Sequence, residues 1–485
     1  MLALMMLQDS PSVSGPIPWT TADLLAATGG DLLSGDMRQF FAGISIDSRN
    51  IAAGSLFVAI RGQVHDGHRF LPEVVAAGAR GIIVDGSTLE TMALDSLKRQ
   101  GVVVIAVKET TRALGDLAGF NRKRAGVSVV AITGSNGKTS TKEMTAAVVS
   151  RRFRTLSTSG NLNNEIGLPL TLLKLEPLHQ WAVLELGMNH AGEIRRLAEI
   201  CRPDVGIITN IGRAHLEGLG SLDGVMRAKG ELLEKIKPGG RAVLNADDPR
   251  VLELAKKTGL AVTFFGLSEN AAVRAVAVKS TPATVNFRLV LPAEEIDITL
   301  AATGRFMVYN ALAAAGIGFT LGFSAAEIKA GLENFKAIGG RMNIIQTRKK
   351  VSIVDDTYNA NPASMQAAIT ALGELKGNNR GILVISDMLE LGHGAETLHR
   401  EIGAFSARTH TDRLYLTGDY AEAVKAGALE GGADPGTIFS GTRAEILADL
   451  TGRLKAGDWV LVKGSRAMGM EKIVMSLKTW GDGPD

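Results

Sequence analysis

The sequence contains one cysteine among its 485 residues, Cys201, so no disulfide can form within the chain. A cysteine-rich zinc site is excluded for the same reason, and a reducing compartment is expected. The charges are also balanced, because 53 Lys and Arg against 50 Asp and Glu give a formal net charge of +3. Proteins that wrap nucleic acid normally carry a strong positive excess, so we expect no nucleic-acid partner.

Apolar runs long enough to cross a bilayer are also missing. The most apolar helix-like stretch, residues 311–323, contains several glycines and falls short of the roughly 18 residues that a span needs. The segment Met1 to Leu7 is apolar but has no basic residues, and polar residues interrupt it at once, so we expect no signal peptide. These absences predict a cytoplasmic protein without membrane insertion, and we expect it to act as a monomer.

Proline is sparse, at 14 residues, whereas glycine is abundant, at 56. Glycine permits tight turns and a close approach of the backbone to a ligand, so its surplus predicts many such positions. The length corresponds to about three domains at roughly 150 residues each. With 45% apolar and 21% charged residues, the composition is typical of a soluble globular chain.

Short β-branched runs alternate with helical patterns through most of the chain, which predicts βαβ units and mainly parallel sheets. Each run is almost continuously apolar, as is typical of strands covered by helices on both faces. We predict such strands over residues 55–60, 81–84, 102–107, 127–132, 181–186, 205–209, 351–355, 381–385 and 459–462. Further runs at 273–278, 285–290 and 296–300 lack helices between them and predict an antiparallel flap.

Two joints divide this pattern. A predicted helix over residues 111–125 ends in a basic cluster, and a new strand follows immediately. A glycine pair, Gly339 and Gly340, follows an amphipathic helix at 325–335 and precedes another strand. The joints predict domains over residues 1–125, 126–338 and 339–485.

The strongest local signal is a glycine turn between an apolar strand and a helical pattern, Thr133-Gly-Ser-Asn-Gly-Lys-Thr-Ser140. Such a turn aims backbone N–H groups and the helix dipole at phosphate oxygens. Lys138 would neutralise phosphate charge, and the Thr139 hydroxyl would ligate Mg²⁺. The strict phosphate-loop pattern requires glycine where this chain has Ile132, so a plain turn with an exposed lysine is the alternative. The strand, loop and helix context favours nucleotide binding.

Three further polar residues are candidates, two of them near strand ends and one in a helical pattern. Glu185 lies near the end of an apolar strand, where a carboxylate is costly unless it is paired or bound to a cation. His215 follows another strand, at the edge where parallel sheets carry ligands, although a lone loop histidine is more often structural. Lys229 comes fourteen residues later, in what could be merely a solvated helix.

Polar loops recur elsewhere. The asparagines of segment 161–164 could form a network of turns or offer amides to a ligand. In Asp355-Asp-Thr-Tyr-Asn-Ala-Asn-Pro362 a strand runs into a polar loop before a helix that begins at Pro362, which favours a nucleotide or substrate contact. Two more strand ends, at 386–392 and 463–466, repeat this arrangement.

Together these motifs resemble the Mur ligases of bacterial cell-wall synthesis. The resemblance covers about residues 20–475 and rests on Asp47-Ser-Arg49, Thr133–Thr139, Asp355–Pro362 and Leu461–Arg466. It implies a three-domain α/β fold with a smaller N-terminal α/β domain for a UDP-sugar, a central ATP-binding domain built on a P-loop-type, mainly parallel sheet, and a Rossmann-like C-terminal domain. It also implies ATP-dependent amide synthesis through an acyl phosphate, in which D-alanyl-D-alanine attacks an activated UDP-muramyl-tripeptide.

The resemblance also implies roles for individual residues. Catalytic roles would fall to Lys138, His215 and Lys229. Two Mg²⁺ sites would use Thr139, Glu185, His215 and a carbamoylated Lys229. ATP contacts would come from Gly134, Ser135, Asn136, Gly137, Lys138, Thr139, Ser140, Asn310, Arg341, Asp356 and Tyr358. Substrate contacts would come from Ser48, Arg49, Asn163, Asn164, Asn359, Asn361, Lys463 and Ser465.

The chain departs from the family pattern at two places. Phe306-Met307 stand where the family usually has His-Asn, which leaves Asn310 to act alone beside the nucleotide, and Ser386 stands where glycine is usual. The main alternative is a ligase similar to folylpolyglutamate synthetase, which lacks the N-terminal UDP-sugar segment. A second alternative is a nucleotide-gated binding protein without turnover. The sequence leaves open whether the third residue of the peptide is diaminopimelate or lysine.

Overall fold

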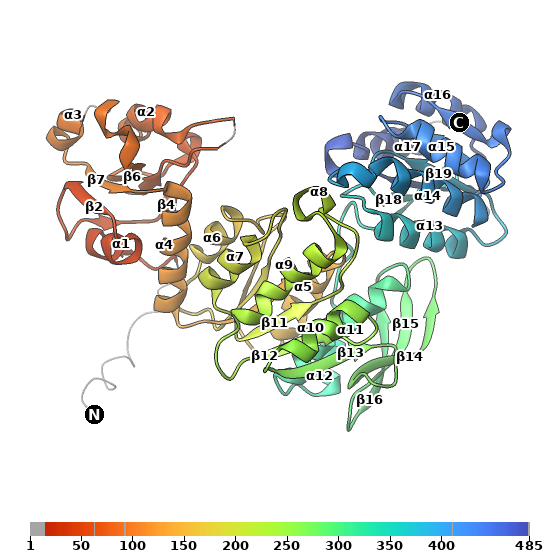
Figure 1. Cartoon of the computed structure of the whole chain (residues 1–485), viewed down its shortest axis with the longest axis horizontal. Helices are drawn as coiled ribbons and strands as arrows, with labels where there is room; N and C mark the ends of the chain where they lie inside the picture. The colour runs from red at the N-terminus through yellow and green to blue at the C-terminus, as the bar shows by residue number, and fades with distance from the viewer. Residues whose placement is uncertain (1–14, 63, 92–93, 410, 484–485) are drawn as a thin grey trace.

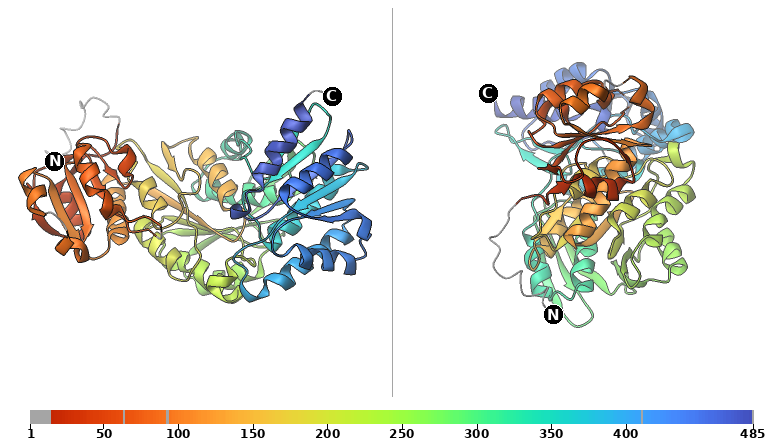
Figure 2. Two further views of the ribbon diagram at one scale, coloured as in Figure 1. Left: turned by 90° about the horizontal axis from the view of Figure 1, so that it is seen from above. Right: turned by 90° about the vertical axis from the view of Figure 1, so that its left-hand side faces the viewer.

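The computed structural model describes residues 15–62, 64–91, 94–409 and 411–483, and these form three main sheets that follow one another along an elongated molecule (Figure 1). The same row is visible from above, with the N-terminal part at one end and the C-terminal part at the other (Figure 2). The expectation for Met1 to Leu7 lies outside the described residues. No helix among the described residues is long and apolar enough to cross a membrane.

The N-terminal part contains a five-stranded sheet in the order β2-β7-β6-β5-β4, in which only β2 runs antiparallel to its neighbour. A separate two-stranded sheet pairs β1 with β3. The strands are β1 Trp19–Thr20, β2 Asp31–Ser34, β3 Phe40–Phe41, β4 Ile44–Ser45, β5 Leu56–Val58, β6 Gly81–Asp85 and β7 Val103–Val107. The helices are α1 Thr21–Thr28, α2 Leu71–Ala76, α3 Leu94–Arg99 and α4 Thr110–Ala125.

The central sheet has nine strands in the order β16-β15-β14-β13-β12-β11-β8-β10-β9. It is parallel from β9 to β14, and β14, β15 and β16 then pair antiparallel, so the predicted flap is confirmed. The strands are β8 Ser128–Thr133, β9 Thr155–Ser157, β10 Trp181–Glu185, β11 Val205–Ile208, β12 Arg241–Asn245, β13 Ala261–Gly266, β14 Val273–Ser280, β15 Val285–Val290 and β16 Glu295–Leu300. The helices are α5 Lys138–Val149, α6 Gly167–Leu172, α7 Glu193–Cys201, α8 Leu216–Leu219, α9 Leu222–Glu234, α10 Pro249–Lys257, α11 Phe306–Thr320 and α12 Ala325–Glu333.

The C-terminal sheet has six strands in the order β17-β18-β22-β19-β20-β21, all parallel except the edge strand β17. The strands are β17 Asn343–Gln346, β18 Ser352–Asp356, β19 Gly381–Ile385, β20 Arg413–Leu416, β21 Ile438–Ser440 and β22 Trp459–Lys463. The helices are α13 Pro362–Lys376, α14 Ala395–Arg408, α15 Ala421–Glu430, α16 Arg443–Arg453 and α17 Glu471–Asp482.

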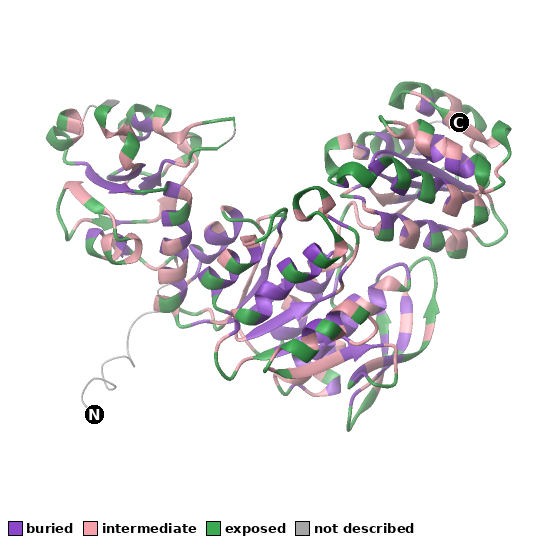
Figure 3. Ribbon diagram, in the orientation of Figure 1, coloured by how far each residue is buried: buried purple, intermediate pink, exposed green. Residues whose placement is uncertain are grey.

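Every strand predicted from an apolar run is present within one or two residues of its expected bounds, and α13 begins at Pro362 as predicted. The buried strands lie between exposed helix faces, as their composition requires (Figure 3). Strands such as β13 escaped prediction because their exposed and half-buried residues interrupt the apolar run. The proposed division of function at residues 126 and 339 stays a prediction.

The three sheets are joined in two different ways. Helix α4 packs against α1 of the N-terminal part and against α6 and α7 of the central part. Its residue Leu114 belongs to one continuous apolar core that also contains Ile105 and Leu184, from the two flanking sheets. The C-terminal sheet has its own cores, which meet the central part mainly through the half-buried Leu216 and Phe306. The N-terminal part is therefore fused to the centre, whereas the C-terminal part is docked on it.

Candidate functional site

The predicted phosphate loop lies between β8 and α5, at the carboxyl edge of the parallel sheet. Gly134 and Gly137 both have positive φ angles, of 152° and 81°. A Cβ atom on Gly134 would lie 1.9 Å from the hydroxyl of Thr209, and one on Gly137 would lie 2.2 Å from the side-chain oxygen of Asn310. Both positions therefore require glycine for conformation and for space, which accounts for the loop's sequence.

The loop is fixed by a neighbouring segment that the sequence analysis did not single out. The Ser135 hydroxyl donates to the Gly212 carbonyl, and the Asn136 backbone N–H donates to the side chain of Asn210. The Thr209 hydroxyl donates to the Asn136 carbonyl at 2.7 Å. Asn210 lies two residues after the end of β11, and this position near the glycine loop that follows the adjacent strand is the signal that could have revealed it.

Lys138 opens α5 and curls back over the loop. Its Nζ donates to the carbonyl of Gly134 at 2.8 Å and to that of Ser135 at 3.4 Å. Burial lowers the pKa of the Lys138 amine, and the nearby Glu185 carboxylate acts in the opposite direction. The ammonium is thus held at the loop beside a carboxylate, where it can neutralise an anionic ligand.

Glu185 ends β10 and is only 3% exposed. Its Oε1 accepts a hydrogen bond of 2.8 Å from the Asn163 amide, while its buried Oε2 has no hydrogen-bond partner. The sequence did not predict the residues that hold Glu185 in place. The Thr158 hydroxyl accepts a hydrogen bond from the Glu185 backbone N–H, and the Lys142 amine donates to the Thr158 carbonyl. A buried carboxylate oxygen without a partner is well suited to a cation.

His215 precedes α8 as its N-cap residue, and Lys229 lies in α9. Lys229 is 1% exposed, no described residue forms an ion pair with it, and burial lowers the pKa of its amine well below the usual value. The positive charge of Lys138 acts on this pKa in the same direction. Lys229 is therefore a buried, reactive amine and not the solvated surface residue of the alternative reading. His215 adopts a positive φ of 55° and is half-buried.

The C-terminal part reaches this edge with three of the predicted residues. The Arg341 guanidinium donates to the Thr139 hydroxyl at 2.7 Å, and the Asn361 amide donates to the side-chain oxygen of Asn136 at 2.7 Å. Arg341 also stacks over the ring of Tyr358 at 4.1 Å. The phosphate loop and the loop after β18 thus face each other.

Other predicted residues have partners within the C-terminal part. Lys463 is 2% exposed, and its Nζ lies 2.5 Å from an Asp356 oxygen and 2.9 Å from the Asn359 carbonyl. The Ser465 hydroxyl accepts from the Leu389 backbone N–H at 2.8 Å. These contacts hold the ends of neighbouring strands together, and the roles of these residues toward ligands stay predictions.

The remaining predicted residues are dispersed. The Asn164 side chain accepts from two backbone N–H groups at the start of α6, which is the turn-forming alternative for this residue. Ser48 and Arg49 lie in the N-terminal part, where Arg49 is exposed and paired with Asp47. Contact with Arg49 lowers the pKa of Asp47 to about 2.

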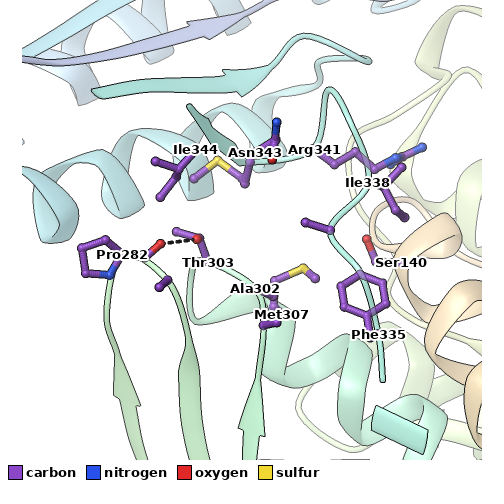
Figure 4. A pocket seen from close by; sticks show the side chains of 14 residues that line it. Ser140, Pro282, Ala302, Thr303, Met307, Phe335, Ile338, Arg341, Asn343 and Ile344 are labelled. Atoms are coloured by element: carbon purple, nitrogen blue, oxygen red, sulfur yellow. Dashed lines mark hydrogen bonds between the residues drawn. The ribbon is translucent and has the colours of Figure 1, made fainter. Parts of the chain in front are cut away.

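A cavity of about 170 Å³ lies where the C-terminal part meets the central part, between the start of α11 and the segment that leads into β17 (Figure 4). Ser140 lines one side, Met307 lies on its floor, and Arg341 and Ile344 come from the opposite part (Figure 4). The Met307 sulfur also accepts a hydrogen bond from the buried Asn310 amide. The cavity is lined by both polar and apolar side chains and includes Ser140 from the helix that follows the phosphate loop, and the arrangement as a whole can bind a nucleotide phosphate chain.

The same residues include possible ligands for a metal ion. No group of three or more His, Cys, Asp or Glu side chains arranged for a metal occurs in the part of the chain that the structure describes. The unpartnered Glu185 oxygen and the Thr139 hydroxyl are nevertheless oxygen donors of the kind that Mg²⁺ prefers, with phosphate and water as the usual remaining ligands. The residues present therefore fit a magnesium ion that arrives with a nucleotide.

The profile of the Mur ligase family, catalytic domain, matches residues 41–122, that of the Mur ligase middle domain residues 132–318, and that of the Mur ligase, glutamate ligase domain, residues 340–466. The UDP-N-acetylmuramoyl-tripeptide–D-alanyl-D-alanine ligase of Escherichia coli (strain K12) is 38% identical over 459 residues, which cover 93% of this chain and 97% of that protein. The chain belongs to the Mur ligase family.

Solved structures agree with this membership. MurF from Acinetobacter baumannii resembles this Mur ligase with a TM-score of 0.88 and 35% identity, over 96% of this chain and 99% of that chain. MurF ligase from Thermotoga maritima in complex with ADP does so with a TM-score of 0.80 and 28% identity, over 90% and 97% of the two chains. The predicted family, the three-domain α/β class and the assignment as a ligase are confirmed.

Proposed function

We infer that this Mur ligase joins D-alanyl-D-alanine to a UDP-N-acetylmuramoyl-tripeptide at the expense of ATP, in the cytoplasmic synthesis of peptidoglycan precursors. The observation that carries this proposal is the buried Glu185 Oε2 without a hydrogen-bond partner, together with the buried Lys229 amine whose pKa burial and Lys138 lower, at the Lys138 phosphate loop. The whole-chain similarity to a ligase of that name in Escherichia coli supports the choice of substrates.

The chemistry explains why the site needs cations. In the first step a carboxylate oxygen of the tripeptide attacks the γ-phosphorus of ATP, and the bond to the ADP oxygen breaks. In the second step the dipeptide amine attacks the carbonyl of the acyl phosphate, phosphate leaves, and the nitrogen loses a proton. Two anions meet in the first step, so Lys138 and Arg341 hold and neutralise the phosphate chain.

Magnesium would be held by Thr139 and Glu185, and a second ion by His215 and a carbamate on Lys229, where it supplies charge neutralisation for the phosphoryl group. Carbamoylation requires a neutral amine, and burial and the charge of Lys138, which lower the pKa of Lys229, favour that form. The modification converts the amine into an anion, which a metal cation can approach. The buried amine without an acidic partner is what supports this assignment.

We assign the three substrates to three domains. Residues 1–125, with Ser48 and Arg49, would hold the UDP end, and residues 126–338 would hold ATP through Gly134–Ser140 and Asn310. Residues 339–485 would close over ATP with Arg341, Asp356 and Tyr358 and offer Asn359, Asn361, Lys463 and Ser465 toward the substrates. Asn163 would reach the muramyl-peptide from beside Glu185, and Asn164 would shape that loop.

The test is turnover by the purified full chain with ATP, D-alanyl-D-alanine and UDP-muramyl-tripeptides that carry either lysine or diaminopimelate. We expect phosphate release that requires all three substrates, and a product whose mass equals the two joined reactants minus water. Phosphate release with folate and glutamate instead would identify the folylpolyglutamate alternative. ATP binding without any substrate-stimulated hydrolysis would identify a binding protein and refute the ligase.

A further inference from the structure

The loop after β19 carries a carboxylate across to the central part. Glu390, at the tip of this loop, adopts a positive φ of 63°, and its Oε2 lies 2.7 Å from Nδ1 of His215. The Glu390 carbonyl also accepts a hydrogen bond of 3.1 Å from the backbone N–H of Glu217. Both residues of this contact thus have left-handed backbone conformations, which are strained for residues other than glycine.

The loop that delivers Glu390 is held from several directions. The backbone N–H of Met388 donates to Nε2 of the buried His399, and that of Leu389 donates to the Ser465 hydroxyl. The Asp387 carboxylate, 3% exposed, accepts from the backbone N–H groups of residues 419 and 420. The position of the carboxylate is therefore set by the C-terminal fold and not by a free side chain.

The contact gives the two nitrogens of the His215 ring different roles. A carboxylate beside Nδ1 favours the tautomer that carries its proton there, which leaves Nε2 as the lone pair available to a ligand. Nδ1 has no aligned hydrogen bond among the described residues, and such contacts commonly tighten when substrates bind.

We propose that Glu390 is a positioning residue: docking of the C-terminal part brings its carboxylate to Nδ1 of His215 and fixes the imidazole for the reaction. The catalytic role of His215 would then depend on closure, because the group that orients its ring comes from the part that closes. The kinetic consequence rests on the proposed ligase function, whereas the contact itself does not.

A second ion pair between the same two parts provides a matched control. Arg213 and Glu401 lie 3.2 Å apart, and both side chains are about half exposed, at 52% and 48%. Exposed pairs of this kind contribute little to stability. Glu401→Gln removes a charge from the same interface without touching His215, so it should leave turnover and the state of the His215 ring unchanged.

The experiment compares Glu390→Gln, Glu390→Asp and Glu401→Gln in the full chain, each first checked for wild-type thermal unfolding. In Glu390→Gln we expect kcat to fall about 10- to 100-fold with little change in the KM for ATP, as for other residues that orient a histidine. Glu390→Asp should recover part of the loss because it keeps the charge and the backbone contact. Equal kcat values in Glu390→Gln and Glu401→Gln would overturn the proposal.

A second, spectroscopic experiment tests the contact between Glu390 and His215 independently of catalysis. In ¹⁵N-histidine-labelled protein without ligands, we expect the His215 ring, assigned with a His215→Asn variant, to carry its proton on Nδ1 and to lose this preference in Glu390→Gln. An unchanged ring signature in Glu390→Gln would overturn the proposal even if kcat falls, because the loss would then arise elsewhere. If the wild type shows no ligase activity, the proposed function fails, and the ring signature alone still decides for or against the contact.

Discussion

At the carboxyl edge of the central sheet, the buried Glu185 Oε2 has no hydrogen-bond partner, and no described residue forms an ion pair with the buried Lys229. At the same edge of the C-terminal sheet, Asp356, Lys463 and Ser465 are paired with one another or with the backbone. Unpaired buried polar atoms cost stability unless a ligand engages them, whereas paired ones stabilise the fold. The unpaired groups of the first edge are therefore suited to a ligand, whereas the paired residues of the second edge also hold loops in place, and their roles toward ligands stay predictions.

We expect the largest effect when the Lys138 cation at the edge of the central sheet is removed. Lys138→Met should lower ATP-dependent phosphate release about 10³-fold, because the phosphate chain loses its fixed positive charge. Stability should change little, since among the described residues the Lys138 amine forms hydrogen bonds with two loop carbonyls alone. Release within tenfold of wild type would show that this edge does not handle phosphate.

We expect the next largest effect when the ion pair between Lys463 and Asp356, at the edge of the C-terminal sheet, is broken. Lys463→Met leaves the Asp356 carboxylate without its cation, and we expect the free energy of unfolding of the C-terminal part to fall by about 3 kcal/mol. Urea denaturation measures this change. The double variant Lys463→Met/Asp356→Asn should regain most of the loss. A single variant as stable as wild type would remove the distinction between the two edges.

We expect a third variant to raise the free energy of unfolding, in contrast to the loss predicted for Lys463→Met. Without ligands or carbon dioxide, Lys229→Met replaces a buried amine that lacks an acidic partner, so the unfolding free energy should rise by about 1 kcal/mol. Turnover should be lost at the same time. Adding bicarbonate to the wild type should narrow the difference in stability, and a destabilised Lys229→Met protein would mean that the amine has a partner after all.

The smallest expected effect concerns a single hydroxyl. Ser465→Ala removes the acceptor of the Leu389 N–H, and the unfolding free energy should fall by about 1 kcal/mol. Hydrogen exchange at Leu389 should accelerate, whereas exchange in the phosphate loop should not. Faster exchange at both places would indicate that the two edges are mechanically coupled.

The sequence predicted those features whose physics is local. The phosphate loop was recognisable because its pattern lies in neighbouring residues: Gly134 and Gly137, which both have positive φ angles, stand between a strand and a helix. The Asp356 and Lys463 pair was not, because it depends on the register of β18 against β22, about 100 residues apart in the chain. Glu390 was visible as part of a polar strand end, but its partner His215 lies on another sheet and is brought close only by docking.

The shared core around α4 has a further consequence. Since the N-terminal and central sheets bury their side chains in the same apolar cluster, neither can lose its packing without exposing the other. The C-terminal cores can melt separately. A molecule with three main sheets should thus unfold in a calorimeter as two cooperative units, and a nucleotide analogue that bridges the docked interface should draw the two transitions together.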